Sequence, residues 1–145
     1  MIIDSFSQQD TEDLGFSMAQ KAVKGDFFAL IGDLGAGKTA FTRGFAKGLG
    51  ISEAISSPTF AIINEYHGGR LPLYHFDVYR IQSAENMEDT GFEDYFYSSQ
   101  GVVLVEWANL IKEILPHHAK ILEFTRDLAR GEEYRKITIT GGGKN

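Results

Sequence analysis

Two glycines, a lysine and a threonine at fixed spacing are the residues of this chain best suited to chemistry. They belong to one stretch, Gly32-Asp33-Leu34-Gly35-Ala36-Gly37-Lys38-Thr39, which fits the pattern G-x-x-x-x-G-K-[ST]. Glycine lets the backbone approach an anion closely because no Cβ intervenes, and successive backbone N–H groups form an anion nest. The stretch therefore predicts a site for the phosphates of a nucleoside triphosphate. The candidates for binding it are Asp33, Leu34, Gly35, Ala36, Gly37, Lys38 and Thr39.

The flanking residues place this stretch between a strand and a helix. An apolar run, Phe27–Ile31, precedes it, and Phe41 and Phe45 follow at helical spacing. The helix N-terminus then faces the phosphates. We expect Lys38 to reach the β- and γ-phosphates and the Thr39 hydroxyl to hold Mg²⁺. The alternative, a plain glycine-rich turn, is disfavoured by this context.

Two carboxylates end predicted strands and are candidates for the metal side of the site. Glu106 follows the apolar run Val102–Val105, which is typical of a buried parallel strand, and Asp77 follows Leu73–Phe76. Glu106 could instead cap the next helix, and Asp77 could simply pair with Arg80. The pattern favours a functional Glu106, in catalysis and as a metal ligand, and leaves Asp77 open.

Other polar residues are less informative. Ser57-Pro58-Thr59 could sense the γ-phosphate, although a plain turn is the simpler interpretation. His75 on a strand is more typical of a structural histidine, and Trp107 of a core residue. An arginine to stabilise the transition state is also expected, but the sequence does not choose among the candidates. These are Arg43, Arg80, Arg126 and Arg130. The absence of an obvious strong catalyst indicates a slow hydrolase that needs a partner.

The composition limits the class of protein. The chain has 145 residues, which suits one domain, expected over residues 1–140 with a flexible tail at 141–145. A net charge of −6 argues against a broad nucleic-acid footprint. There is no cysteine, Met1–Asp10 does not resemble a signal peptide, and no apolar stretch has membrane-spanning length. We expect a cytoplasmic protein with no membrane partner.

Alternating strand and helix patterns predict an α/β fold. A helix capped by Ser7 or Asp10 should carry Leu14, Met18 and Ala22 and end at Gly25. Strands are predicted at 27–31, 60–66, 71–77, 102–105, 120–125 and 135–140, and helical segments from the phosphate loop to 49 and at 83–88, 91–97 and 110–115. The expected architecture is a P-loop NTPase-like three-layer sandwich, with a mostly parallel central sheet and antiparallel edge hairpins.

Four blocks of sequence together resemble the TsaE family, formerly called the YjeE ATPases. They are residues 32–44 around the phosphate loop, Ser57-Pro58-Thr59-Phe60, His75-Phe76-Asp77-Val78-Tyr79-Arg80, and Gly101-Val102-Val103-Leu104-Val105-Glu106-Trp107-Ala108. The resemblance covers about Thr11 to Leu115. It implies a cytoplasmic bacterial ATPase that works with TsaB and TsaD to make threonylcarbamoyladenosine at position 37 of tRNA, so that contact with the tRNA is through the complex.

The resemblance also implies roles for residues. Lys38 and Thr39 would serve the phosphates and Mg²⁺, Glu106 would be a metal-side carboxylate, and Asp77 would lie in the active site. Thr11 would lie beside the bound nucleotide. Trp107 and the Ser57–Thr59 segment would belong to the rim of the site or to a switch.

Three other functions share the same phosphate loop. A small-molecule or nucleotide kinase needs an arginine-bearing lid, which Arg126–Arg130 suggests only weakly. A GTPase usually carries Asn-Lys-x-Asp, and this string does not occur in the chain. A third possibility is a module that uses ATP only as a structural ligand.

Overall fold

The fold is built around one mixed β-sheet. The structure, a computed structural model, describes residues 1–32, 37–55, 63–78, 92–97 and 100–141. Within these residues seven strands form the sheet, in the order β1-β7-β6-β2-β5-β4-β3. The strands are β1 (Ile2–Ser5), β2 (Phe27–Gly32), β3 (Ile63–Tyr66), β4 (Leu73–Asp77), β5 (Val102–Glu106), β6 (Lys120–Arg126) and β7 (Arg135–Gly141).

The four central strands are parallel and the edges are antiparallel. Strand β2 pairs in parallel with β5 and with β6, and β5 pairs in parallel with β4. The pairs β1–β7, β6–β7 and β3–β4 are antiparallel. Because parallel strands end at the same edge, the carboxyl ends of β2, β4 and β5 meet at one place, where open α/β sheets bind their ligands.

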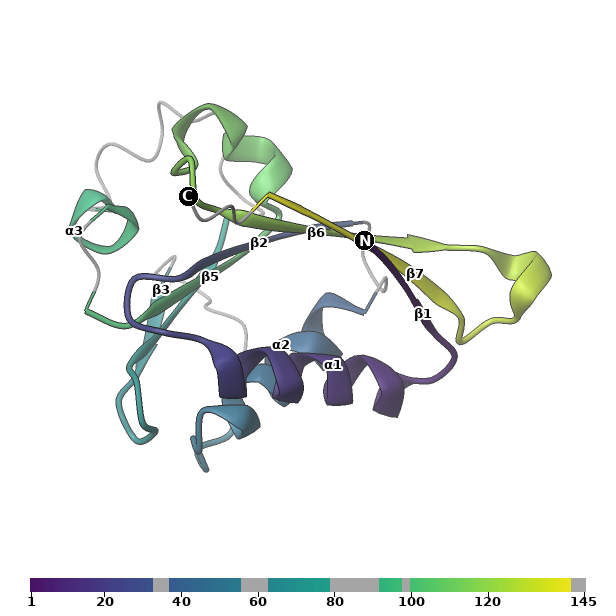
Figure 1. Ribbon diagram of the computed structural model, residues 1–145, viewed down its shortest axis with the longest axis horizontal. Coiled ribbons are helices and arrows are strands. Elements are labelled where there is room, and N and C mark those ends of the chain that lie inside the picture. Colours follow the sequence, from purple (N-terminus) through teal and green to yellow (C-terminus); the bar gives the residue numbers. More distant parts are fainter. Residues whose placement is uncertain (33–36, 56–62, 79–91, 98–99, 142–145) are drawn as a thin grey trace.

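Helices cover both faces of the sheet, as Figure 1 shows. The longer helices α1 (Gln8–Lys21) and α2 (Lys38–Gly48) lie side by side on one face. The other face carries α3 (Glu93–Phe96) and a 3₁₀ segment, η2 (Ala108–Ile114), while a short turn, η3 (Leu128–Arg130), joins β6 to β7. The predicted three-layer α/β sandwich with antiparallel edges is thus confirmed. None of the described helices has the length and apolarity needed to cross a bilayer.

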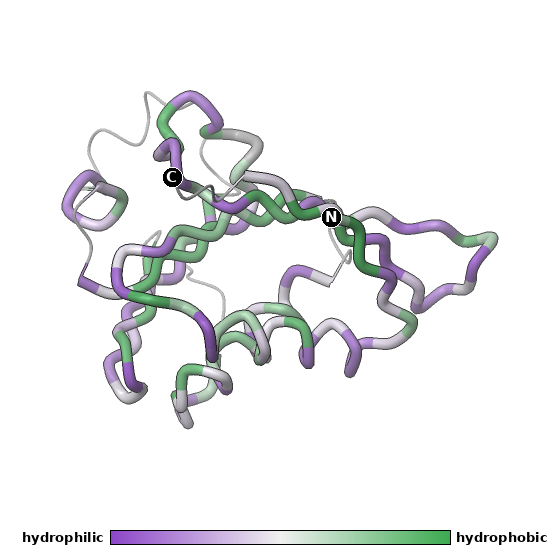
Figure 2. Tube along the Cα trace, in the orientation of Figure 1, coloured by the Kyte–Doolittle hydropathy of each residue, from purple (hydrophilic) through white to green (hydrophobic). Residues whose placement is uncertain are grey.

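Two apolar cores lie on opposite faces of the sheet. The core beneath α1 and α2 contains Leu30, Phe41, Phe45 and Leu104, all 0% exposed. The second core packs Phe27, Val103, Val105 and their neighbours against α3 and η2. Figure 2 shows the resulting concentration of hydrophobic residues along the central strands. Consecutive residues of β5 therefore point into different cores, which explains why its sequence is apolar without alternation.

The packing of α1 on α2 differs from the sequence expectation. The buried residues of α1 are small ones, Thr11, Gly15 and Ala19, whereas Leu14 and Met18 are only partly buried. A Cβ on Gly15 would lie 2.3 Å from the Phe41 carbonyl oxygen. The helices approach so closely that only small residues fit between them, and the larger apolar residues are displaced to the side of this contact.

Other details also depart from the expectations. Helix α1 ends at Lys21 rather than at Gly25, and strand β1 was not predicted. The predicted helix at 110–115 is instead η2, with a break in helical geometry at Ile111. Gly141, predicted as the first residue of the tail 141–145, is the last residue of β7. The first residues of the predicted strand 60–66, the predicted helix 83–88 and the rest of the tail lie outside the described residues.

Candidate functional site

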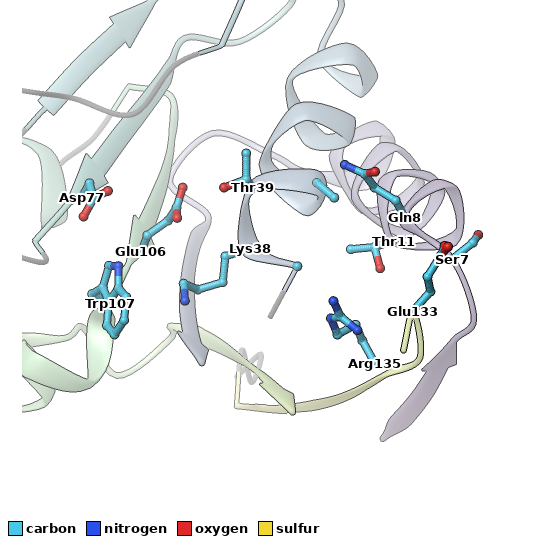
Figure 3. Close-up of a pocket in the computed structure, with 12 residues that line it drawn as sticks. Ser7, Gln8, Thr11, Lys38, Thr39, Asp77, Glu106, Trp107, Glu133 and Arg135 are labelled. Carbon is cyan, nitrogen blue, oxygen red and sulfur yellow. The ribbon is translucent and has the colours of Figure 1, made fainter. Parts of the chain in front are cut away.

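A cavity of about 430 Å³ lies at the carboxyl edge of the central strands. The ends of β4 and β5, the N-termini of α1 and α2, and the start of β7 enclose it, as Figure 3 shows. Its described lining residues are Ser7, Gln8, Thr11, Gly37, Lys38, Thr39, Ala40, Asp77, Glu106, Trp107, Glu133 and Arg135. The cavity thus brings together the predicted Thr11, Lys38, Thr39, Asp77 and Glu106.

Two helix N-termini point their partial positive charge at this cavity. Helix α2 follows Gly37, whose φ of 107° is in the left-handed region that only glycine adopts readily. Helix α1 follows Ser7, whose side chain accepts a hydrogen bond from the Asp10 backbone N–H. Aligned peptide dipoles favour anions at such ends. This part of the cavity therefore suits phosphate.

Lys38 is held against two neighbours within the cavity. Its Nζ donates a hydrogen bond to the carbonyl of Gly32 and lies 4.2 Å from the centroid of the Trp107 ring. Although the residue is only 5% exposed, its amine lies in the wall of the cavity, as Figure 3 shows. Trp107 reaches this position through a φ of 63°, which is uncommon for a residue with a side chain. Trp107 packs partly buried against the second core, as its residue type indicated, and it also lines the cavity, as the family resemblance implied.

The two candidate carboxylates are direct neighbours. Strands β4 and β5 pair so that Asp77 lies opposite Glu106, about 4.8 Å across the sheet. Figure 3 shows the Thr39 hydroxyl pointing toward the Glu106 carboxylate, with Asp77 on the far side of Glu106. Glu106 is 4% exposed and ends β5, and the 3₁₀ segment that follows has no side-chain cap. The helix-cap alternative for Glu106 is therefore wrong.

One oxygen of Glu106 is tied to the protein by two contacts. Oε2 accepts hydrogen bonds from His75 Nε2 at 2.8 Å and from Thr42 Oγ1 at 3.4 Å. Thr42 Oγ1 has a single proton and also lies 2.8 Å from the Lys38 carbonyl, so the two acceptors share this donor and the contact with Oε2 is the weaker one. These contacts connect the end of β5 to the start of α2, so the Glu106 carboxylate and the N-terminus of this helix are held in one arrangement.

Thr11 lies beside Gly37, the residue before α2, although it is far from it in sequence. Its Oγ1 forms a 2.7 Å hydrogen bond with Ser5 Oγ, and the residue is 1% exposed. A Cβ on Gly37 would come 3.8 Å from the Thr11 methyl group. The hydroxyl contact joins β1 to α1 and fixes the helix end that borders the cavity.

Arg135 also lines the cavity, although it was not predicted as a site residue. Its Nη1 donates to the backbone carbonyls of Glu132 and Tyr134 at 2.7 and 2.8 Å. Burial lowers the pKa of its guanidinium, and nearby Arg126 lowers it further, while Glu133 opposes both effects. Because β7 runs antiparallel to β6, its first residue lies at the carboxyl edge of the central strands. This placement follows from the β6–β7 hairpin that was predicted, and it could have pointed to Arg135.

The arginines considered from sequence lie elsewhere. Arg43 pairs with Glu12 at 3.2 Å, and Arg130 stacks over Tyr134 at 4.4 Å. Arg43, Arg126 and Arg130 are all absent from the described lining of the cavity. Arg80 lies outside the described residues, as do two other predicted sets, Asp33-Leu34-Gly35-Ala36 and Ser57–Thr59.

The donor set of the cavity fits a hard divalent cation. Thr39, Asp77 and Glu106 offer oxygen atoms, the ligands that Mg²⁺ prefers. Within the described part of the chain, no group of three or more histidine, cysteine, aspartate or glutamate residues is arranged to hold a metal.

Comparison with known proteins gives the family. The sequence profile described as "Threonylcarbamoyl adenosine biosynthesis protein TsaE" matches residues 5–137. The chain is 49% identical to tRNA threonylcarbamoyladenosine biosynthesis protein TsaE of Bacillus subtilis, over 93% of this chain and 82% of that protein. The same-named protein of Treponema pallidum is 42% identical, over 93% and 96% of the two chains.

A solved structure agrees with this assignment. The crystal structure of Bacillus subtilis YdiB superposes with a TM-score of 0.83 at 43% identity, and the match covers 99% of this chain and 86% of that one. The family profile matches most of the chain, and the two relatives named above are similar to it over nearly its whole length. This chain therefore belongs to the TsaE family of threonylcarbamoyl adenosine biosynthesis proteins.

Proposed function

We propose that this protein binds ATP with Mg²⁺ in the cavity and hydrolyses it slowly. The observation that carries the proposal is the meeting of Lys38, Thr39 and Glu106 in one cavity at the start of α2. A phosphoryl-transfer site requires a phosphate-binding cation, a hydroxyl for the metal and a carboxylate beside them. The G-x-x-x-x-G-K-[ST] pattern of residues 32–39 adds the backbone nest expected for the phosphates.

The charges of the cavity support the need for a metal ion. Two cations, Lys38 and Arg135, face three carboxylates, Asp77, Glu106 and Glu133. A triphosphate adds several negative charges to this already acidic wall, so a divalent cation is required for favourable binding. Thr39 and Glu106, with Asp77 alongside, are the residues that would hold it. When bound, Mg²⁺ supplies charge neutralisation at the phosphate oxygens.

The residues of the chain then have separate tasks. Lys38 exchanges its contacts with the Gly32 carbonyl and the Trp107 ring for the β- and γ-phosphates. The N-termini of α1 and α2 stabilise the same negative charge. The buried Glu106 carboxylate would polarise the attacking water or orient a water beside the metal, and Arg135, an arginine of the described cavity lining, would assist the leaving group.

We further propose that the ATPase acts in threonylcarbamoyladenosine synthesis at position 37 of tRNA, in the cytoplasm and together with TsaB and TsaD. The names of the relatives support the pathway. The net charge of −6 supports contact with tRNA through partners rather than directly. Dependence on partners would also explain a site with few strong catalytic groups.

A reconstituted tRNA-modification assay tests this proposal. With matched TsaB, TsaD, tRNA and ATP, adding this protein should raise the number of modified tRNAs formed per complex, and TsaB–TsaD should raise its ATPase rate. The Lys38→Ala variant should not raise the number of modified tRNAs, and TsaB–TsaD should not raise its ATPase rate. If turnover of tRNA and of ATP is the same with and without the protein, the proposed role is wrong.

A kinase function has less support. The lid-like segment Arg126–Arg130 forms the turn between β6 and β7, and Arg130 lies over Tyr134 and 3.5 Å from Asp4. These contacts hold the arginine outside the cavity lining.

A further inference from the structure

We propose that His75 is a positioning residue that holds the Glu106 carboxylate in its working orientation. The inference rests on the proposed ATPase function and adds a residue to it. Its basis is a 2.8 Å hydrogen bond between His75 Nε2 and Glu106 Oε2 in the interior of the protein. The side chains of the two residues are 1% and 6% exposed.

The sheet itself directs both side chains to the same place. His75 and Asp77 are two residues apart on β4 and point to one face of the sheet, and Glu106 lies opposite Asp77 on β5. His75 is therefore the diagonal neighbour of Glu106. Leu73 and Leu104, which share this face, belong to the core beneath α1 and α2. The imidazole separates that apolar core from the carboxylate.

Stability alone does not account for an imidazole at this position. Its Nδ1 atom is buried and has no hydrogen-bond partner among the described residues. An unpaired buried polar atom destabilises the folded state, and a leucine would pack against Leu73 and Leu104 without that cost. The hydrogen bond to Glu106 is therefore the interaction that explains why position 75 carries an imidazole.

The contact also determines which oxygen of Glu106 is free to act. A carboxylate can only accept hydrogen bonds, so Nε2 of His75 carries the proton and donates it. The hydrogen bonds from His75 and Thr42 both fall on Oε2. Oε1 accepts none from the described residues and remains for a metal ion or a water in the cavity. Without His75 the carboxylate would rotate among several orientations.

Variants at position 75 separate positioning from packing. His75→Gln keeps an N–H donor near the position of Nε2, whereas His75→Leu keeps the volume and removes the donor. The control is His118→Leu, since His118 is exposed and contacts the Gly25 carbonyl at the opposite edge of the sheet. Each variant is compared in the wild-type and in the Glu106→Gln background, for kcat, for the KM of ATP, and for the Mg²⁺ concentration that gives half-maximal rate.

We expect His75→Leu to lower kcat about tenfold or more with a KM for ATP within about threefold, because substrate binding is retained while the carboxylate is misplaced. His75→Gln should recover most of the rate. In the Glu106→Gln background the further effect of His75→Leu should fall below about twofold, since residues that act as a unit are not additive. Equal losses in both backgrounds, or a loss in KM alone, would overturn the inference.

A measurement on the nucleotide-free protein tests the contact without activity. Long-range ¹⁵N–¹H NMR of the histidine rings should show His75 protonated at Nε2, with a signal that shifts in Glu106→Gln and not in His118→Leu. Protonation at Nδ1 would overturn the inference, even where His75→Leu fails to fold. If wild-type protein hydrolyses no ATP but the NMR result holds, the proposed ATPase function fails and the His75–Glu106 contact stands.

Discussion

Lys38 and Trp107 contact each other across the mouth of the site, with the lysine amine 4.2 Å from the centre of the indole ring. The ring face attracts a cation, and the contact is worth on the order of 1 kcal/mol when exposed and more when desolvated. Lys38 is thus preorganised at the cavity wall before any phosphate arrives. Binding a triphosphate must replace this contact, so the environment of the indole should differ between the nucleotide-free and the nucleotide-bound protein.

Glu106→Gln should separate ATP binding from hydrolysis. The substitution keeps the shape of the side chain and removes its charge, so we expect ATP to bind while the rate of hydrolysis falls at least about tenfold, or about 1.4 kcal/mol in barrier. Steady-state phosphate release and calorimetric titration of ATP check the two parts.

The matched control is Glu123→Gln, because Glu123 is an exposed residue of β6, a strand separated from β5 by β2. Glu123→Gln should leave both the affinity for ATP and the rate of hydrolysis unchanged. A Glu106→Gln protein that unfolds more easily but retains wild-type turnover would show that Glu106 is structural.

Gly44→Ala should destabilise the protein although alanine favours helices. A Cβ at Gly44 would lie 1.9 Å from the backbone carbonyl oxygen of Glu12, so α1 and α2 must move apart. Overpacking of this kind costs about 1–3 kcal/mol, which exceeds the gain in helix propensity of about 1 kcal/mol.

Thermal unfolding followed by circular dichroism measures the result, and each kcal/mol should lower the Tm by roughly 2–4 °C in a chain of this size. Gln20→Ala, on the exposed side of α1, is the control and should not lower it. An unchanged Tm for Gly44→Ala would mean that the helices are not packed this closely.

Tyr95 should make the protein sensitive to alkali. Its hydroxyl donates to Glu65 Oε2 at 2.6 Å, and this hydrogen bond, aided by desolvation, raises the pKa of Tyr95 to about 12. In the unfolded chain the pKa is about 10. The unfolded state therefore loses its proton first, and the contribution of Tyr95 to stability is complete below pH 10 and disappears as the pH rises toward 12.

Urea unfolding of wild type and Tyr95→Phe between pH 9 and 12 checks this. The difference between the two free energies of unfolding should shrink toward alkaline pH, and an absorbance titration should lose one high-pH tyrosine in the variant. A difference that is constant over this range would contradict the hydrogen bond to Glu65.

Residues close in sequence were predictable, and residues brought together by strand pairing were not. The phosphate loop and Glu106 follow directly from local pattern, since a glycine-rich turn and an apolar run carry their own signals. That Asp77 lies opposite Glu106 depends on the register of β4 and β5, which local sequence does not specify. The same holds for His75, which was interpreted as structural from its place on a strand and whose partner Glu106 lies 31 residues away.

The buried face of α1 was predicted wrongly because the residues that form it are small. The face of α1 that meets α2 is formed by Thr11, Gly15 and Ala19, and a search for large apolar residues at helical spacing selects Leu14 and Met18 instead. Close helix packing removes the hydrophobic periodicity on which such predictions depend. Thr11 was placed beside the nucleotide from the family resemblance alone, and this same close packing brings it to the cavity.

Titration of ATP and Mg²⁺ into the protein, followed by the fluorescence of its single tryptophan, tests the central claim most directly. Trp107 contacts Lys38, so phosphate binding should give a saturable change in emission. Lys38→Ala should weaken binding at least about tenfold, and Lys47→Ala, on the exposed side of the same helix, should not. If calorimetry and fluorescence both detect no binding to the wild-type protein, or if Lys38→Ala binds ATP as tightly as wild type, the cavity is not the nucleotide site.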